Sequence, residues 1–170
     1  MDDYVAAVIS SEMPSSYGLE AAKVQAIAAR SFAKIQQNSS NYLYYGAQLD
    51  DSTNTQVYNN IHPSDITYQA SKETSGKVLM HNGNIINSKF FSTSCGYTAN
   101  FGEVWASGEV FPTNTPVYLV SRQQYVGDRL VNNLSSEKDA YTFFKLTDKD
   151  INAFDNHSPW FRWTTVLNSE

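Results

Sequence analysis

Hydrophobic and polar positions alternate with a helical period near the start of the chain. Residues 19–33 hold no glycine or proline and are rich in residues that favour helix. One stripe of this helix consists of Ala22, Ala26, Ala29 and Ala33. The roughly opposite face carries Glu20, Val24, Ile27 and Ser31. The pattern predicts a helix over about Leu19–Gln37 that is buried on both sides, with Glu20 in its first turn at the edge of a core.

The same kind of pattern predicts further elements along the chain. A short helix is expected at about Asp3–Glu12, ended by Pro14, and another is expected to be capped by the segment His62–Asp65 and to reach about Glu73. Asn82-Gly83 between two apolar runs predicts a β-hairpin. Other expected elements are a strand continuing through Lys89–Phe91, a helical or mixed segment at Phe143–Phe154 and an aromatic strand at Ser158–Thr164. Together they predict one α+β domain over residues 1–170, in which the Ala-rich helix packs against antiparallel strands.

Composition narrows the classes of ligand. The net charge is −5, whereas a nucleic-acid-binding protein usually shows a basic patch, so no nucleic-acid partner is expected. Aromatic residues make up 14% and charged residues only 17%. Aromatic rings form good platforms for flat ligands and sugars. The composition therefore favours an uncharged polar ligand such as a glycan.

Cysteine and histidine usage argues against several chemistries. Cys95 is the single cysteine, so an intrachain disulfide is impossible. The three histidines stand far apart and form no metal-binding pair, so no metal or cofactor is expected. Cys95 lacks the local signature of a cysteine nucleophile, and Ser92 and Ser94 lack that of a serine nucleophile. The tract 92–98 either offers hydroxyl and N–H groups to a polar ligand or is a plain turn.

Glu20 is the candidate for acid–base chemistry. Burial of a carboxyl favours the protonated form that a general acid needs, whereas a helix N-terminus favours the ionised form. An ordinary ion pair with Lys23 is the alternative. Glycoside hydrolysis usually needs a second carboxylate, for which Asp51 and Glu103 are candidates, but a lytic transglycosylase can use one.

Several sequence blocks stand in order along nearly the whole chain: Tyr4–Pro14, Leu19–Ala33, Asp51–Tyr58, Glu73–Leu79, Phe90–Asn100 with Val104-Trp105, and Ser158–Thr164. Together these blocks resemble the stage II sporulation protein D family, whose domain also occurs in amidase-enhancer proteins. The resemblance implies a lytic transglycosylase that cleaves the bond between N-acetylmuramic acid and N-acetylglucosamine and leaves 1,6-anhydro ends. It implies that Glu20 is the catalytic acid/base.

The resemblance also implies substrate-binding residues, partners and a location. The expected substrate-binding residues are Arg30, Gln56, Tyr58, Ser92, Thr93, Ser94, Tyr97 and Thr98. For Arg30 and Trp105 a purely structural role is an equal alternative. The substrate would be peptidoglycan glycan strands that an N-acetylmuramoyl-L-alanine amidase has stripped of stem peptides. We expect an extracytoplasmic protein at the cell wall or septal membrane, acting in engulfment during sporulation, with any leader or membrane anchor outside this chain.

Three departures from the family pattern stand out. Cys95 occupies a position where glycine or alanine is common, and residues around Gln56 lack the Cys and His that bind zinc in some members. Phe101-Gly102-Glu103 lacks one of the usual acidic groups. Two alternatives stay open: a non-catalytic wall-binding module that recruits or stimulates an amidase, and a thiol enzyme that uses Cys95.

Overall fold

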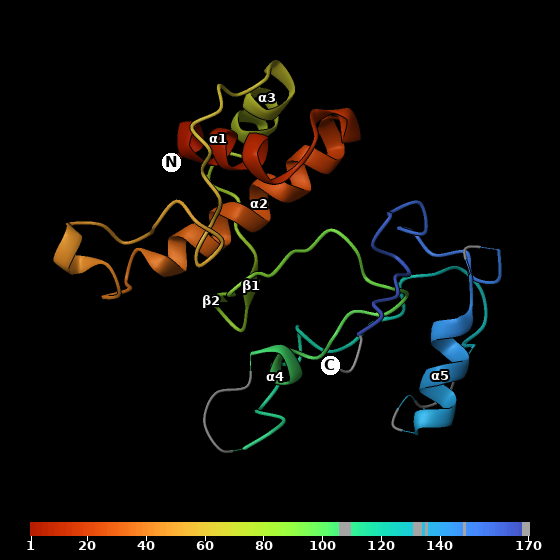
Figure 1. Cartoon of the computed structure of the whole chain (residues 1–170). Helices are drawn as coiled ribbons and strands as arrows, with labels where there is room; N and C mark the ends of the chain where they lie inside the picture. Colours follow the sequence, from red (N-terminus) through yellow and green to blue (C-terminus); the bar gives the residue numbers. More distant parts are fainter. Residues whose placement is uncertain (106–109, 131–133, 135, 148, 168–170) are drawn as a thin grey trace. The chain divides into compact units, whose positions relative to one another are not determined.

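A computed structural model describes residues 1–105, 110–130, 134, 136–147 and 149–167. The chain divides into two compact units, Met1–Phe90 and Phe91–Glu170 (Figure 1). Helices and a small antiparallel sheet occur together, which confirms the α+β class. Each unit has its own hydrophobic cluster. One domain over residues 1–170 stays a prediction.

Three helices build the first unit. They are α1 (Asp2–Glu12), α2 (Gly18–Gln36) and α3 (Asp65–Glu73), accompanied by the single 3₁₀ turns η1 (Ser15–Tyr17) and η2 (Leu43–Tyr45). Each α-helix agrees with its predicted range to within about two residues. The Ser64 hydroxyl accepts a hydrogen bond from the Thr67 N–H at 3.3 Å, so α3 begins at a side-chain cap as expected.

The core of the first unit lies where the three helices meet. Val5 and Ile9 of α1 pack with the α2 alanines and with Ala70 of α3. All four alanines of the predicted stripe are buried, because their small side chains allow the helices to approach closely. The opposite face is buried only toward its C-terminal end. Ser31 is fully buried, but Val24 is 70% exposed, so the prediction of burial on both sides is wrong for the first half of α2.

A two-residue turn closes the predicted hairpin. Strands β1 (Met80–His81) and β2 (Asn84–Ile85) pair antiparallel, with Met80 opposite Ile85. Asn82 and Gly83 both have positive φ angles, 48° and 78°, as a hairpin turn of this length requires. The hairpin contacts α2 through β2, but α2 packs mainly against α1 and α3. The strand does not continue through 89–91.

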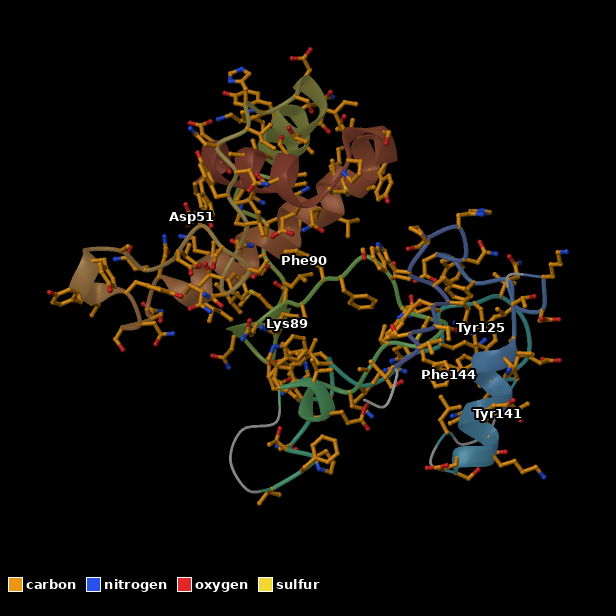
Figure 2. The ribbon with its side chains drawn as sticks, viewed as in Figure 1. Asp51, Lys89, Phe90, Tyr125, Tyr141 and Phe144 are labelled. Atoms are coloured by element: carbon orange, nitrogen blue, oxygen red, sulfur yellow. The ribbon has the colours of Figure 1, made fainter. Side chains whose placement is uncertain are left out.

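The second unit has little regular structure. It contains α4 (Phe101–Val104) and α5 (Glu137–Lys145), and its core consists of Tyr125, Phe143, Ile151, Ala153 and Phe161. The helix expected from residue 143 thus begins at 137 and ends at 145. The aromatic strand expected at 158–164 is wrong, because those residues form turns and irregular backbone. Figure 2 shows the side chains of Tyr125, Tyr141 and Phe144 in this unit.

Gly102 allows two segments of the second unit to approach closely. A Cβ atom added there would lie 1.8 Å from the Thr113 carbonyl oxygen. The Gly102 N–H also donates to the Thr115 hydroxyl at 2.9 Å. We expect Gly102→Ala to lower the free energy of unfolding by about 1–3 kcal/mol, because the backbone must move apart. The measurement is urea unfolding followed by tryptophan fluorescence, since all three tryptophans lie in this unit. Ala99→Ser, at an exposed position, is the control, and an unchanged midpoint for Gly102→Ala would contradict the prediction.

Candidate functional site

Glu20 lies in the first turn of α2 with its carboxylate open to solvent. Its side chain is 84% exposed, and Lys23 donates a hydrogen bond to Oε1 at 2.8 Å. The expectation of a carboxyl at the edge of the core is therefore wrong. The i,i+3 ion pair considered as the alternative is present, and pairs of this exposure contribute little to stability. Glu20 is thus positioned to meet a ligand from solvent.

Lys23 connects Glu20 to a second carboxylate. Its ammonium lies 2.7 Å from Oε2 of Glu73, the last residue of α3, and Gln69 donates to Oε1 of Glu73 at 2.7 Å. The hydrogen bonds from Lys23 and then Gln69 lower the pKa of Glu73, and the hydrogen bonds to Glu20 and then Glu73 raise the pKa of Lys23. Glu73 was missed as a neighbour of Glu20, because no sequence periodicity relates positions 20 and 73.

Asp51 and Glu103 are the two residues expected from the sequence as candidates for a second carboxylate. Glu103 belongs to the second unit, where its Oε2 accepts from the Asn100 N–H at 3.1 Å in a capping box at the start of α4. The Asn100-x-x-Glu103 spacing already carries this capping signal. Asp51 is exposed in a loop of the first unit (Figure 2). Glu103 therefore has a structural role that its sequence context explains.

Arg30 is a structural residue in this fold. Its side chain is 1% exposed, and its guanidinium donates to the carbonyl oxygens of Thr74 at 2.8 Å and Ser71 at 2.9 Å. It also contacts Oδ1 of Asp2 at 3.1 Å. Arg30 thereby joins the start of α1, the middle of α2 and the C-terminal end of α3. The expectation that it binds substrate is corrected to the structural alternative, because the buried group cannot reach a ligand.

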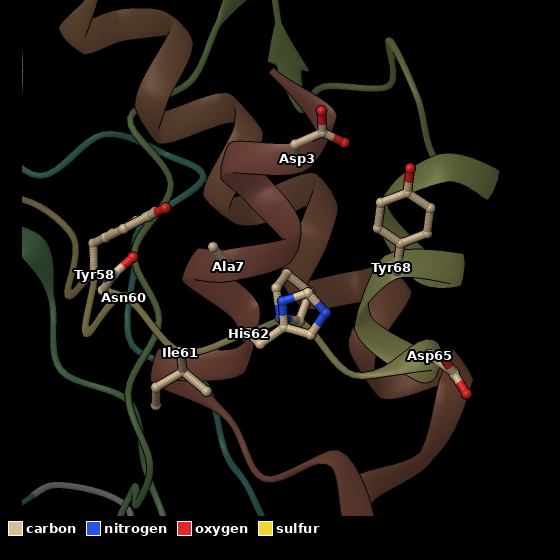
Figure 3. A pocket seen from close by; sticks show the side chains of 9 residues that line it. Asp3, Ala7, Tyr58, Asn60, Ile61, His62, Asp65 and Tyr68 are labelled. Atoms are coloured by element: carbon tan, nitrogen blue, oxygen red, sulfur yellow. The ribbon is translucent and has the colours of Figure 1, made fainter.

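Gln56 and Tyr58 occupy different environments although two positions separate them. Gln56 is 1% exposed, accepts from the Tyr4 hydroxyl at 3.0 Å and donates to the Ala29 carbonyl at 3.2 Å. Because Gln56 is buried, it cannot contact substrate as expected. Its hydrogen bonds instead connect the loop that carries it to α1 and α2. Tyr58 is half-buried, stacks on Tyr4 and lines a pocket of about 580 Å³ (Figure 3).

The tract 92–98 lies in the second unit. Most of its polar groups form hydrogen bonds with other residues of that unit. The Thr93 and Ser158 hydroxyls are 2.7 Å apart, and the Ser94 N–H donates to the Asp155 carboxylate. The Tyr97 and Tyr125 hydroxyls are 2.6 Å apart. The Thr98 hydroxyl accepts from the Arg122 N–H at 2.7 Å. Ser92 is exposed, whereas Ser94 is buried. Of the seven residues, Ser92 offers the most accessible hydroxyl.

Cys95 sits at the turn of this tract. Its φ is +49°, a conformation that glycine adopts more easily than other residues do. The Arg162 guanidinium donates to the Cys95 carbonyl at 2.9 Å and holds the turn. Burial raises the pKa of the Cys95 thiol, the opposite of what an activated nucleophile needs. The geometry argues against a thiol enzyme.

We expect native Cys95 to react several-fold more slowly with iodoacetamide at pH 7 than Cys95 in the urea-unfolded chain. Fewer thiols are ionised when the pKa is raised, and half-burial limits access. Mass spectrometry of the labelled chain over time measures both rates. A native rate equal to or above the unfolded rate would revive the thiol-enzyme hypothesis.

Within the described ranges, no group of three or more His, Cys, Asp or Glu side chains is arranged to hold a metal ion. None of the described helices has the length and apolar character needed to cross a membrane. The absence of a metal requirement stays a prediction.

Known proteins resemble this chain over much of its length. Residues 1–81 match the family model described as stage II sporulation protein. The amidase enhancer of Bacillus subtilis (strain 168) is 38% identical over 100 residues, which are 59% of this chain and 13% of that protein. Stage II sporulation protein D of the same organism is 36% identical over 63% of this chain and 35% of its own length.

A third relative extends the similarity. Stage II sporulation protein D of Bacillus amyloliquefaciens is 33% identical over 144 residues, 72% of this chain and 42% of that protein. The chain therefore spans less than half the length of these relatives. Glu20, Lys23, Arg30, Gln56, Tyr58 and Glu73 all lie within the matched region 1–81. With this match and these relatives, the chain belongs to the stage II sporulation protein D family.

Proposed function

We propose that the chain is a lytic transglycosylase of peptidoglycan with Glu20 as its catalytic acid/base, acting in cell-wall remodelling during sporulation. The observation that carries the proposal is a solvent-exposed carboxylate in the first turn of α2, inside the region that matches the family model. Its exposure leaves room for a polymer to approach from solvent. The names of the relatives, a stage II sporulation protein and an amidase enhancer, support a role at the cell wall.

The proposed reaction needs one carboxyl group. Protonated Glu20 gives its proton to the glycosidic oxygen between N-acetylmuramic acid and N-acetylglucosamine, and the bond from the anomeric carbon to that oxygen breaks. The 6-hydroxyl oxygen of the muramic acid then bonds to the anomeric carbon, and its proton returns to Glu20. No water is consumed, and a 1,6-anhydro end forms. Positioned acid–base groups of this kind contribute about 10²- to 10⁴-fold to a rate.

Other residues take supporting roles in this proposal. In the ligand-free protein, Lys23 forms ion pairs with both Glu20 and Glu73. If its contact with Glu20 breaks when substrate binds, the Lys23 ammonium keeps the Glu73 carboxylate as its partner. Ser92, Thr93, Ser94, Tyr97 and Thr98 are proposed to contact the glycan, with the exposed Ser92 as the strongest candidate. The substrate would be strands freed of stem peptides by an amidase, outside the cytoplasm.

Product chemistry tests this proposal. Peptide-free glycan strands are incubated with the chain, and the ends are identified by mass spectrometry. Anhydro ends support a transglycosylase. Reducing ends would show a hydrolase and would make Glu73 the first candidate for the second carboxylate, because it shares Lys23 with Glu20. Intact strands would contradict catalysis.

A second candidate, a wall-binding module that recruits or stimulates an amidase, has its own observation. The Glu20 carboxylate is 84% exposed and paired with an ammonium, whereas a general acid gains from burial without a cation. A relative also carries the name amidase enhancer. Stimulation of a purified amidase that persists in Glu20→Gln, together with intact strands, would favour this candidate.

A further inference from the structure

A pocket opens at one end of the three-helix unit, away from Glu20. It has a volume of about 580 Å³, within the range of sites for small molecules (Figure 3). Its walls come from α1, from residues 58–63 and from the first turns of α3. Tyr68 is the lining residue of α3 nearest to Glu73, and five residues, about 7.5 Å along the helix axis, separate it from the Glu20–Lys23–Glu73 cluster.

Two tyrosines line opposite sides of the pocket. Figure 3 shows Tyr58 on one side and Tyr68 of α3 on the other. Tyr58 stacks on Tyr4, with ring centres 5.9 Å apart, and the Lys72 ammonium lies 5.0 Å from the centre of the Tyr68 ring. Neither Tyr4 nor Lys72 lines the pocket. Tyr58 is half-buried and Tyr68 is 46% exposed, so part of each ring is accessible to a ligand.

The polar groups of the pocket carry a negative charge. Asp3 and Asp65 line it together with Asn60 and His62, and Lys72 forms an ion pair with Asp3 at 3.3 Å. Two carboxylates against one bordering ammonium favour neutral or cationic ligands and repel a carboxylate. Aromatic faces with hydrogen-bonding groups between them suit a ring that has apolar faces and a polar edge.

We propose that this pocket binds a glucosamine unit, either N-acetylated or as the free amine, and excludes the muramic acid unit. A muramic acid unit freed of its stem peptide carries a lactyl carboxylate, which Asp3 and Asp65 repel. A glucosamine unit is neutral when acetylated and cationic when not. The proposal takes its choice of glycan from the proposed function. It assigns to the pocket a sugar specificity that Glu20 chemistry does not require.

The test measures binding of two soluble probes, the N-acetylglucosamine tetramer and the glucosamine tetramer. The protein is the whole chain carrying Glu20→Gln, so that no probe is cleaved, and the method is isothermal titration calorimetry. We expect both tetramers to bind, the cationic one more tightly. Tyr68→Ala should weaken both at least about fivefold, whereas Tyr68→Phe, which keeps the ring, should stay within about twofold. Tyr17→Ala removes an exposed tyrosine outside the pocket and should change nothing.

A further substitution tests the role of the two carboxylates. Asp65→Asn should abolish the preference for the cationic tetramer, because it removes one of the two carboxylates. Failure of both tetramers to bind, or equal binding by the parent and Tyr68→Ala, would overturn the proposal. Failure of the proposed function is distinguishable, because it appears as intact glycan strands with the unmutated chain whatever the tetramers do.

Discussion

Replacing Glu20 by glutamine is expected to reduce the yield of anhydro ends from peptide-free glycan strands by about 10²- to 10⁴-fold. Glutamine keeps the shape of the side chain and can still accept a hydrogen bond from Lys23, but it cannot donate and recover a proton. The fold should be unchanged, because the side chain is 84% exposed and makes only one ion pair. Mass spectrometry measures the initial rate at which anhydro ends form. Circular dichroism in urea measures the midpoint of unfolding and so tests whether the fold is unchanged.

Glu137→Gln is the matched control for this substitution. Glu137 is an exposed glutamate in the first turn of α5, in the other unit. Its replacement changes the net charge by the same amount and should leave the yield of anhydro ends unchanged. Glu20→Gln with undiminished yield would refute the assignment of Glu20 as acid/base.

Replacing Arg30 by methionine is expected to lower the free energy of unfolding of the first unit by about 3–5 kcal/mol. Methionine fills much of the same volume, but it leaves the buried carbonyl oxygens of Thr74 and Ser71 without their donor. It also removes the partner of Asp2, whose pKa the Ser75 hydroxyl and then Arg30 lower. Helices dominate this unit, so far-ultraviolet circular dichroism in urea reports its unfolding.

Arg122→Met is the control for the charge change, because Arg122 is exposed. It should shift the urea midpoint little. A loss below about 1 kcal/mol for Arg30→Met would mean that Arg30 is not the structural centre of the unit. A strong loss of glycan binding without loss of stability would restore the substrate-binding role expected from the sequence.

The helices could be predicted because their signals are local. The alanine stripe of α2, the cap at Ser64 and the Asn82-Gly83 turn each fix structure within a few residues, and all three are present. The strand predicted at 158–164 is absent. Trp160 and Trp163 are residues that favour strands, but they lie in irregular backbone and are largely exposed. No partner strand was available in the sequence to decide that question.

The site could be predicted less well, because the burial of a side chain depends on residues that are far away in the sequence. Arg30 and Gln56 sit at motif positions, yet whether a motif residue faces a ligand or the interior depends on segments far along the chain. Arg30 is buried by residues 71–77, and Gln56 by Tyr4. The proximity of Glu73 to Glu20 likewise depends on how α3 packs on α2.

The contacts of Arg30 also set an order of folding. They tie Asp2 to residues up to Lys77, a span almost equal to the region 1–81 that matches the family model. During synthesis, α1 is complete about 65 residues before that partner region exists. The α2 partner of α1 is complete at Gln36, but at 5–20 residues per second the contacts of Arg30 with residues 71–77 form only about 3–13 s after α1 is complete. The three-helix core is therefore completed late in the synthesis of this region, and an interruption before residue 77 would release a chain in which Arg30 lacks its α3 partners.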